Sequence, residues 1–590
     1  MKREEPYMDT YYTSEINVQM LVFLMKAHGI KKVVVSPGTT NITFVASIQQ
    51  DEYFELISAA DERSAAYIAC GIAAESHEPV AISCTGATAS RNYIPGLTEA
   101  YYRNLPILAI TSTQHSGRIG QLMAQVIDRS TVQNDIVVKS VYVPLCHTDE
   151  DKWACNIKLN TALLELRRKC NGPVHINIET DYNNDFSIKT LPDYRVIRRV
   201  SFSDFFNFPD IKSSKVCIFV GAHLSWSEEL TKEVDLFCEK YNGAVYCDNT
   251  SNYHGKYRVQ YNLISAQQHF FESNSPELLI DIGQVSGAYM EISPKKVWRI
   301  SLDGEVRDRF RTLEYVFEMD ELSFFSEYNK KGKGYNISYY DECKNEYDMV
   351  YNKIDSNIIP FSNIWIASKT VSHVPDSSII HFGILNSLRS WNFFSLPNSI
   401  DCYSNTGGFG IDGVMSTLLG GALTNKEKIH YLVIGDLAFF YDMNSIANRY
   451  LCNNIRILLI NNGCGTEFKN YNHFASKFRD DADPYIAAKG HYGNKSSELI
   501  KHYATDLGFV YISAKNKKEY LDKMYEFVDN KIEKPILFEV FTNDVEESDA
   551  LKYIRTLIVD SPKGMDKVKK IAKSVLGEKR IDNIKKVIRR

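Results

Sequence analysis

Short apolar runs alternate along the chain with longer segments whose apolar residues recur at helical spacing. The runs are rich in Val, Ile and Leu, which favours buried β-strands. Strands are predicted at 31–36, 79–84, 106–112, 174–179, 215–221, 278–283, 378–383, 429–435, 455–461 and 535–541. This alternation is typical of parallel sheets flanked by helices, so it predicts an α/β fold.

Two polar, irregular stretches divide these elements into three α/β blocks. They lie around 190–215 and 328–348. A chain of 590 residues is also too long for one hydrophobic core, and about 150 residues per domain gives three or four domains. We therefore predict three Rossmann-like, doubly wound parallel-sheet domains, followed by a helical tail. Their predicted bounds are 1–190, 200–345 and 355–550, with the tail at 551–590.

The composition is that of an ordinary globular protein, with 44% hydrophobic residues, 24% charged residues and a net charge of −5. This balance gives no reason to expect a nucleic-acid partner. The N-terminal segment lacks the apolar core of a signal peptide, and no apolar stretch approaches the roughly 18 residues of a membrane helix. We therefore expect a cytoplasmic protein. Twelve cysteines without a CxxC pair favour reduced, buried thiols over disulfides or a zinc site.

The end of the chain is strongly basic. From Lys563 to Arg590, eleven Lys or Arg accompany three acidic residues, which gives a charge of +8. Apolar residues recur among them at partly helical spacing. Such a tail is suited to an anionic membrane or an acidic partner, but a solvated helix that covers its own domain is the more common outcome.

Two polar dipeptides follow successive predicted strands in the third block. Gly435 and Asp436 end one strand, and Asn461 and Asn462 end the next. In a doubly wound sheet such strand ends meet at one edge, where ligands bind. Asp436 would offer a carboxylate, Asn462 an amide oxygen and Cys464 a backbone carbonyl, which are hard ligands suited to Mg²⁺. With a helix starting nearby, the sequence predicts a metal-bridged diphosphate site, although both dipeptides are also common turns.

The spacing of these dipeptides is similar to the thiamin-diphosphate motif, and further segments resemble the thiamin-diphosphate-dependent decarboxylase and carboligase superfamily in the same order. ISAADERSAAYIACGIAAES at 57–76 is similar to the segment that carries the catalytic glutamate, which would be Glu62. The resemblance implies that this carboxylate bonds N1′ of the cofactor's aminopyrimidine and so promotes deprotonation of the thiazolium. Asp61 and Glu62 are alternatively acids that stabilise the start of an Ala-rich helix.

Other segments supply further cofactor contacts by resemblance. VVVSPGTTN, CTGATASRNYIPGLTEAYY and GQLMAQV are similar to the pyrimidine-binding domain, where Gln125 would reach the cofactor-bound intermediate. CYSNTGGFGIDGVMSTLLGGAL would approach the cofactor closely, with Ile411 as the apolar support beneath its rings. Turn and core-packing roles are the alternatives for these residues. The predicted cofactor contacts are Gly435, Asp436, Leu437, Ala438, Asn405, Gly410, Ile411, Asn462, Thr85 and Gly86.

Four stretches resemble the menaquinone-pathway SEPHCHC synthase family in particular. They are GDLAFFYDMNSIA, SNTGGFGIDGVMST, DERSAAYIACGIAAE and NNGCGTEF. The likeness implies a pyrimidine-binding, a central and a diphosphate-binding domain. That family binds acidic substrates through arginines after Ser-Pro-Gly and after Ser-Asn, where this chain has Thr39 or Thr40 and Thr406. Threonine does not supply the charge of an arginine fork, so the menaquinone reaction is not the expected one.

Three further residues are substrate candidates. Arg118 lies one position out of register with another family arginine, and a solvated surface arginine is the alternative. His115, near Gln125, and His473, beyond the metal loop, are candidate proton donors or structural histidines. The central block has neither GxGxxG nor an acidic residue at the ribose spacing, so we expect a scaffold domain without a flavin.

The resemblance implies a thiamin-diphosphate- and Mg²⁺-dependent enzyme. It would decarboxylate a 2-oxo acid and transfer the acyl-anion equivalent to a small-molecule acceptor. A simple decarboxylase and a cofactor-binding regulatory relative without turnover are the alternatives. In this superfamily the cofactor lies between two subunits, which implies a homodimer or homotetramer.

Overall fold

A computed structural model describes residues 11–559, apart from 225, 289, 335–337, 491–495 and 532, and apart from the side chains of 205 and 206. The predicted basic tail from Lys563 lies outside the described residues. The chain divides into two compact units, one of residues up to 201 together with 303–318, and one of 202–302 together with 319 onward. No helix among the described residues is long and apolar enough to cross a membrane.

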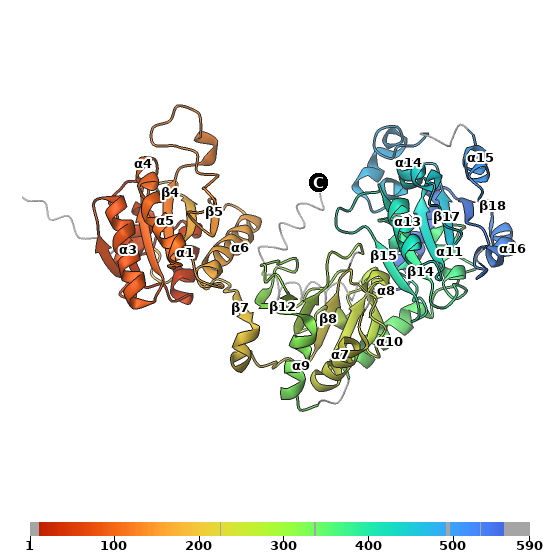
Figure 1. Ribbon diagram of the computed structural model, residues 1–590, viewed down its shortest axis with the longest axis horizontal. Coiled ribbons are helices and arrows are strands. Elements are labelled where there is room, and N and C mark those ends of the chain that lie inside the picture. The colour runs from red at the N-terminus through yellow and green to blue at the C-terminus, as the bar shows by residue number, and fades with distance from the viewer. Residues whose placement is uncertain are drawn as a thin grey trace, which may run out of the picture. The chain divides into compact units, whose positions relative to one another are not determined.

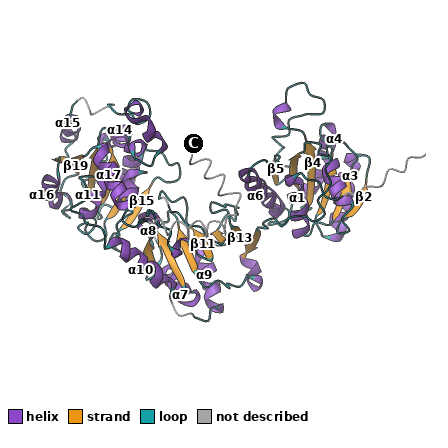
Figure 2. Cartoon of the chain, turned by 180° about the vertical axis from the view of Figure 1, so that it is seen from behind, coloured by secondary structure: helices purple, strands orange, loops and turns teal. Residues whose placement is uncertain are grey.

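Three parallel sheets with flanking helices make up the fold, which confirms the predicted α/β class (Figure 2). The first sheet has the order β2-β1-β3-β4-β6-β5. Its strands are β1 (Lys32–Val35), β2 (Glu55–Ser58), β3 (Val80–Cys84), β4 (Ile107–Thr113), β5 (Lys139–Val143) and β6 (Val174–Glu179). The associated helices are α1 (Ile16–Ala27), α2 (Ile42–Gln49), α3 (Glu62–Ser76), α4 (Thr88–Asn92), α5 (Ile94–Tyr102) and α6 (Asp149–Glu165) (Figure 1).

Both faces of the first sheet are buried. On β1, Val33 packs into a core with α1, α2 and α6, whereas Val34 packs into a second core with α3 and α5. Ala81 and Ile82 on β3 divide between the two cores in the same way. Alternate side chains of a strand point to opposite faces, so strands covered on both sides are apolar throughout. This explains why the sequence shows them as continuous apolar runs.

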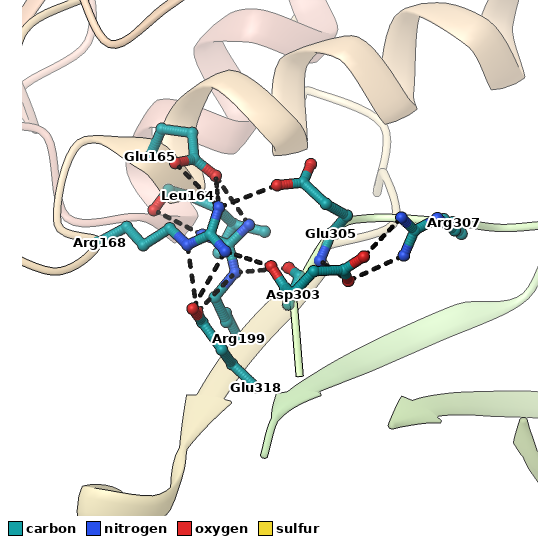
Figure 3. Close-up of polar contacts among 9 residues, drawn as sticks. Leu164, Glu165, Arg168, Arg199, Asp303, Glu305, Arg307 and Glu318 are labelled. Carbon is teal, nitrogen blue, oxygen red and sulfur yellow. Dashed lines mark hydrogen bonds and ion pairs between the residues drawn. The ribbon is translucent and has the colours of Figure 1, made fainter. Parts of the chain in front are cut away.

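A buried ion-pair cluster joins the end of α6 to the segment 303–318 within the first unit (Figure 3). Strands β7 (Arg198–Ser201) and β13 (Leu313–Glu318) pair in parallel beside it. The Arg168 guanidinium contacts Glu165 at 3.2 Å, Glu305 at 3.0 Å and Glu318 at 3.0 Å. Arg199 adds a contact to Glu165 at 2.8 Å. Because the Arg168 side chain is only 12% exposed, several acidic partners are needed to compensate its lost hydration.

The second unit holds strands of two sheets. The strand order of the first of these sheets begins β10-β9-β8-β11-β12 and ends with β13 and β7. The first five of these strands are β8 (Val216–Val220), β9 (Gly243–Cys247), β10 (Arg258–Gln260), β11 (Leu278–Ile282) and β12 (Lys296–Ser301). The neighbouring helices are α7 (Glu228–Tyr241), α8 (Tyr261–Ser265), α9 (Glu321–Lys331) and α10 (Tyr339–Tyr351).

The third sheet has the order β15-β14-β16-β17-β19-β18. Its strands are β14 (Ile379–Phe382), β15 (Asp401–Ser404), β16 (His430–Gly435), β17 (Ile455–Asn461), β18 (Val510–Ala514) and β19 (Ile536–Phe541). Its helices are α11 (Asn363–Thr370), α12 (Asn386–Trp391), α13 (Val414–Thr424), α14 (Asp436–Asp442), α15 (Leu499–Asp506), α16 (Lys517–Phe527) and α17 (Asp544–Arg555). One face packs against α13, α14 and α15 around Leu418, Leu432 and Leu459.

Candidate active site

The ends of β16 and β17 meet at one edge of the third sheet, as predicted. The two strands pair in parallel, with Gly435 opposite Ile460. Asp436, the first residue of α14, lies just beyond that pair and is 5% exposed. Its Oδ1 accepts the Leu437 N–H at 2.9 Å, and its Oδ2 accepts the Gly463 N–H at 2.7 Å. One carboxylate therefore spans the tips of two adjacent strands.

Burial gives the Asp436 carboxyl unusual acid–base properties. Loss of hydration raises its pKa to about 7, while the two backbone N–H groups act in the opposite direction. Glu539 raises the pKa a little further. A buried carboxylate in this state gains more from a nearby cation than an exposed one does, because the interaction is less screened.

The residues at this edge fit a hard divalent cation. The Asn462 amide is half-buried, and its Oδ1 accepts the Cys464 N–H at 3.4 Å, which folds the loop after β17 back toward Asp436. The oxygen donors are thus the Asp436 carboxylate, the Asn462 amide and loop carbonyls such as that of Cys464, the set that suits Mg²⁺. Among the described residues, no cluster of three His, Cys, Asp or Glu side chains is placed to hold a metal. Any cation here would therefore need amide, backbone and ligand oxygens.

Segment 402–423 comprises most of β15, the loop at 405–413 and most of α13, all in the chain's second unit. The Asn405 amide donates to Thr417 Oγ1 at 3.2 Å, and half-buried Ile411 packs against the core beneath α13. A Cβ built on Gly407 or Gly408 would meet nothing within 4 Å, so the loop presents open backbone. Gly410 differs, because a Cβ there would lie 2.2 Å from Asp412 Oδ1. The loop thus has the backbone exposure that a flat ligand requires, and the assigned contacts stay predictions.

A cavity of about 370 Å³ opens near this edge, within the second unit. It includes the predicted substrate residue His473, whose Nδ1 accepts the Ala475 N–H at 3.1 Å. The guanidinium of Arg389, which also lines the cavity, is paired with Glu467 at 2.7 Å. Thr406 is 5% exposed and does not line this cavity, although its methyl would approach a Cβ built on Gly287. The lining residues are Asn262, Ser265, Ala266, Ala288, Met290, Glu291, Ile364, Asn386, Arg389, Ser390, Phe393, Glu467, Asn470, Asn472, His473, Glu547, Leu551 and Arg555.

The first unit carries the predicted glutamate at the start of α3. Asp61 caps this helix by accepting the Arg63 and Ser64 N–H groups, so Glu62 is the first helical residue. The Glu62 carboxylate accepts the Asn92 amide at 3.3 Å and is otherwise open to one side of the unit. Because Asp61 rather than Glu62 caps the helix, the Glu62 carboxylate stays available for a ligand.

The tips of β1 and β3 are joined by threonine hydroxyls. Thr40 Oγ1 lies 2.7 Å from Thr85 Oγ1 and accepts the Gly86 N–H at 2.9 Å. Gln125 has a left-handed backbone, with φ of 63°, and its carbonyl lies 3.3 Å from a Cβ built on Gly86. Thr85, Gly86 and Gln125 are therefore brought together, whereas Thr39 is exposed and takes no part.

His115 and Arg118 line a different cleft of the first unit. Its volume is about 380 Å³, and it lies at the ends of β5 and β6 with Glu179 and Tyr182 on its wall. The Arg118 guanidinium donates to Gln114 at 2.5 Å, and His115 Nδ1 accepts the Gly117 N–H at 3.0 Å. Both side chains are exposed, and the described lining of their cleft does not include Thr40 or Gly86.

Two features of these sites were not predicted. The Arg389–Glu467 pair joins α12 to the loop after β17. Glu467 lies in the quoted stretch NNGCGTEF, but no pattern pointed to Arg389 as its partner. Thr40, one of the two threonines considered for a lost substrate contact, contacts Thr85 Oγ1 and accepts the Gly86 N–H. Both roles depend on side chains far apart in sequence, and single-chain spacing carries no signal for such pairs.

Residues 18–132 match the family described as "Thiamine pyrophosphate enzyme, N-terminal TPP binding domain". Together with the three parallel sheets, this match defines the chain as a thiamin-diphosphate-binding enzyme of the corresponding superfamily. The match covers the β1, β3 and β4 tips and Glu62.

Curated relatives narrow the class. Two proteins named 2-succinyl-5-enolpyruvyl-6-hydroxy-3-cyclohexene-1-carboxylate synthase, from Bacteroides fragilis and Bacteroides thetaiotaomicron, are each 31% identical, covering 92% of this chain and 98% of their own. One of the same name from Flavobacterium johnsoniae is 26% identical, covering 90% and 97%. The chain belongs to the family of these synthases.

Proposed function

We propose that this enzyme binds thiamin diphosphate with Mg²⁺, decarboxylates a 2-oxo acid and transfers the resulting acyl-anion equivalent to an acceptor. The observation that carries the proposal is the Asp436 carboxylate, buried at 5% exposure and bonded to both strand tips at the ligand edge of the third sheet. Decarboxylation without transfer is the simpler alternative. The relatives' name, which describes a synthase, favours the transfer.

The diphosphate half of the site would be held by the second unit. Asp436, Asn462 and the Cys464 carbonyl would supply oxygen ligands to Mg²⁺, whose charge would offset that of the diphosphate. The N–H groups at the start of α14, including that of Ala438, face the same edge and favour an anion. When bound, the cofactor's thiazolium accepts the electrons released as CO₂ leaves.

The proton-transfer half would be supplied by the first unit. Glu62 would hold a proton at its carboxyl while hydrogen-bonding a ring nitrogen of the aminopyrimidine. Gln125 and the Thr40, Thr85 and Gly86 cluster would orient the reacting groups at the β1 and β3 tips. This division of labour requires two edges, one from each unit.

We propose that a second copy of the chain completes each site. On α3, the helix that begins at Glu62, Tyr67 is 47% exposed and Ile68 40% exposed. Exposed large apolar side chains beside a predicted catalytic carboxylate are typical of a surface that is covered in the functional assembly. A homodimer or a homotetramer would cover it.

The substrates would differ from those named in the relatives. The relatives' printed product carries succinyl, enolpyruvyl and carboxylate groups. This chain has Thr39 or Thr40 and Thr406 where the resemblance predicts arginines. Two arginines, Arg389 and Arg555, line the large cavity, but Arg389 is paired with Glu467, and Glu291 and Glu547 line the cavity as well. These features support a 2-oxo acid donor and an acceptor that carry fewer negative charges.

The test is a screen of small 2-oxo acids for CO₂ release, with and without thiamin diphosphate and Mg²⁺. We expect release from at least one acid, dependent on both additions. A second measurement follows acceptor consumption by mass spectrometry, which separates transfer from simple decarboxylation. Calorimetry that detected no binding of thiamin diphosphate at millimolar Mg²⁺ would refute the proposal.

A further inference from the structure

A buried arginine of the first unit has no assigned role. Arg129 is 6% exposed and follows the irregular segment that contains Gln125. Its Nη2 donates to the Ser112 carbonyl at 3.2 Å. Its Nε and Nη1 are also buried, and no acceptor among the described residues lies within hydrogen-bond distance of them. Most of this guanidinium's hydrogen-bonding capacity is therefore unmet by the described protein atoms.

Arg129 lines a small cavity between the first sheet and the helices α4 and α5. The cavity volume is about 40 Å³. It contains a second cationic residue, Arg91, and none of the described residues that line it is acidic. The lining residues are Ser90, Arg91, Tyr93, Ile94, Leu97, Ala109, Thr111, Arg129, Thr131, Val132, Ile136, Val137 and His175.

The electrostatics of this cavity are one-sided. Burial is the main cause that lowers the pKa of Arg129, and the thiol of Cys84 acts in the opposite direction. The charge of Arg91 also lowers this pKa, and the value with all three effects is about 10. His175 is buried, and its pKa falls to about 3, first through burial and then through repulsion by Arg129 and Arg91. At neutral pH the cavity thus holds a cationic Arg129 beside a neutral imidazole. A buried charge without a counter-charge is strongly destabilising. A bound anion would therefore stabilise the folded chain by compensating the charge of Arg129.

We propose that this cavity binds a small monovalent inorganic anion of chloride size at the unpartnered Nε and Nη1 of Arg129. A space of this volume holds a halide or one or two waters, since about 10–15 Å³ of such volume admits one water. Larger anions such as sulfate do not fit. The mainly apolar wall from Ile94, Leu97 and Val132 favours a weakly hydrated ion over a divalent one.

The anion would stabilise the strand tips that carry the predicted cofactor contacts. Thr40 Oγ1 donates to the same Ser112 carbonyl at 3.3 Å, so Arg129 and Thr40 share one acceptor. A Cβ built on Gly86 would lie 3.6 Å from Arg129 Nη1. Fixing the guanidinium therefore fixes the neighbourhood of Gly86, Thr40 and the end of β4. This inference does not rest on the proposed reaction.

Thermal unfolding of the full chain tests the site in solution. At equal ionic strength, chloride and bromide should raise the midpoint of the first unit's transition by about 3 °C over gluconate, when present at tenfold the dissociation constant. An equal response to all three salts would mean that the cavity holds water only, and it would overturn the proposal. A response to formate but not to chloride would equally overturn it.

Crystals grown in bromide test the location directly. We expect an anomalous peak within hydrogen-bond distance of Arg129 Nε or Nη1, and bromide elsewhere with none here would refute the assignment. Arg129→Met removes the cation at similar length and should abolish the difference between chloride and gluconate. Arg103→Met, at a side chain that is 51% exposed, is the matched control and should leave that difference unchanged. If Arg129→Met does not fold, the wild-type bromide peak decides alone.

Discussion

The two ligand edges of the molecule are built on opposite principles. At the third sheet, Asp436 is buried and its carboxylate already holds two backbone N–H groups. At the first sheet, Glu62 stands at a helix start with a single amide contact, from Asn92. The proposed metal edge is thus held by hydrogen bonds within one unit, whereas the proposed catalytic glutamate is half-buried and has fewer fixed contacts.

This difference follows from what each carboxylate has to do. A metal ligand gains from being fixed and desolvated before the ion arrives, because reorganisation then costs less. A proton-transfer group must meet its partner ring, so in the proposed arrangement its surroundings would be completed only when the ligand and a second copy of the chain cover it. We therefore expect changes at Asp436 to affect binding and changes at Glu62 to affect turnover.

Glu62→Gln should have the largest effect of these substitutions on turnover. A smaller effect would contradict the contrast between the two edges. Removing the carboxylate while keeping the shape should lower the rate of CO₂ release by about 10²–10⁴-fold. Thiamin diphosphate affinity, measured by calorimetry, should change little. A variant that lost cofactor binding as severely as turnover would show that the glutamate edge is a binding edge.

Asp436→Asn should weaken Mg²⁺-dependent binding of thiamin diphosphate by about 100-fold, because the amide removes the anionic metal ligand. Titration calorimetry at several Mg²⁺ concentrations measures this directly. Asp506→Asn, on the exposed surface of α15, is the control and should bind as the wild type does. Unchanged affinity in Asp436→Asn would remove the basis of the proposed metal site.

Ile68→Asp tests whether a second copy covers the edge that carries Glu62. A charge in the middle of an apolar interface should raise the dimer dissociation constant by about 10-fold or more. Analytical ultracentrifugation measures the shift. Leu521→Asp, at 39% exposure on α16, matches the 40% exposure of Ile68 and should have no effect on assembly. A monomeric, active wild type would contradict the proposed arrangement.

Acid should destabilise both units through buried histidines, of which His175 in the first unit and His381 in the second have the lowest pKa values. Burial lowers the pKa of His175 and of His381 to about 3, so both stay neutral when folded and take up protons only on unfolding. His381 faces His430, and His175 faces Arg129 and Arg91, which add to the shift. Stability is therefore full above the unfolded pKa near 6.5 and falls below it.

The expected loss is about 2 kcal/mol per histidine at pH 5, since each pH unit below 6.5 costs about 1.4 kcal/mol. Urea unfolding at pH 7 and pH 5 measures it, with hydrogen exchange to assign the loss to each unit. His381→Phe should reduce the pH dependence of the second unit alone. An identical dependence in that variant would mean that other groups dominate.

The buried strands could be predicted because burial on both faces leaves a continuous apolar run. Each of the ten predicted runs contains a strand, from β1 to β19. Other strands were missed. They include the edge strands β2 (Glu55–Ser58), in which all residues are exposed, and β5 (Lys139–Val143), which begins with Lys and Ser. They also include the interior strands β9, β12 and β13, of which β9 is short but buried throughout. For such strands the partner strand, rather than the sequence, determines the conformation.

The site could be predicted where residues that lie close in space also hold equivalent places in the strand pattern of the sequence. Asp436 and Asn462 follow successive strands, so adjacency in the sheet brings them together. Arg129 and Thr40 were beyond such reasoning, because they meet at the Ser112 carbonyl of a third segment. Convergence of three segments depends on packing, and one sequence alone gives no spacing rule for it.

The hydrogen bond from the Gly463 N–H to Asp436 closes a ring of covalent and hydrogen bonds across two strands. The circumference of that ring is set by the number of residues between the end of β17 and the amide. A single insertion between Asn461 and Gly463 would carry the amide away from the carboxylate, even with every ligand residue retained. At this edge, chain length is therefore constrained as tightly as side-chain chemistry.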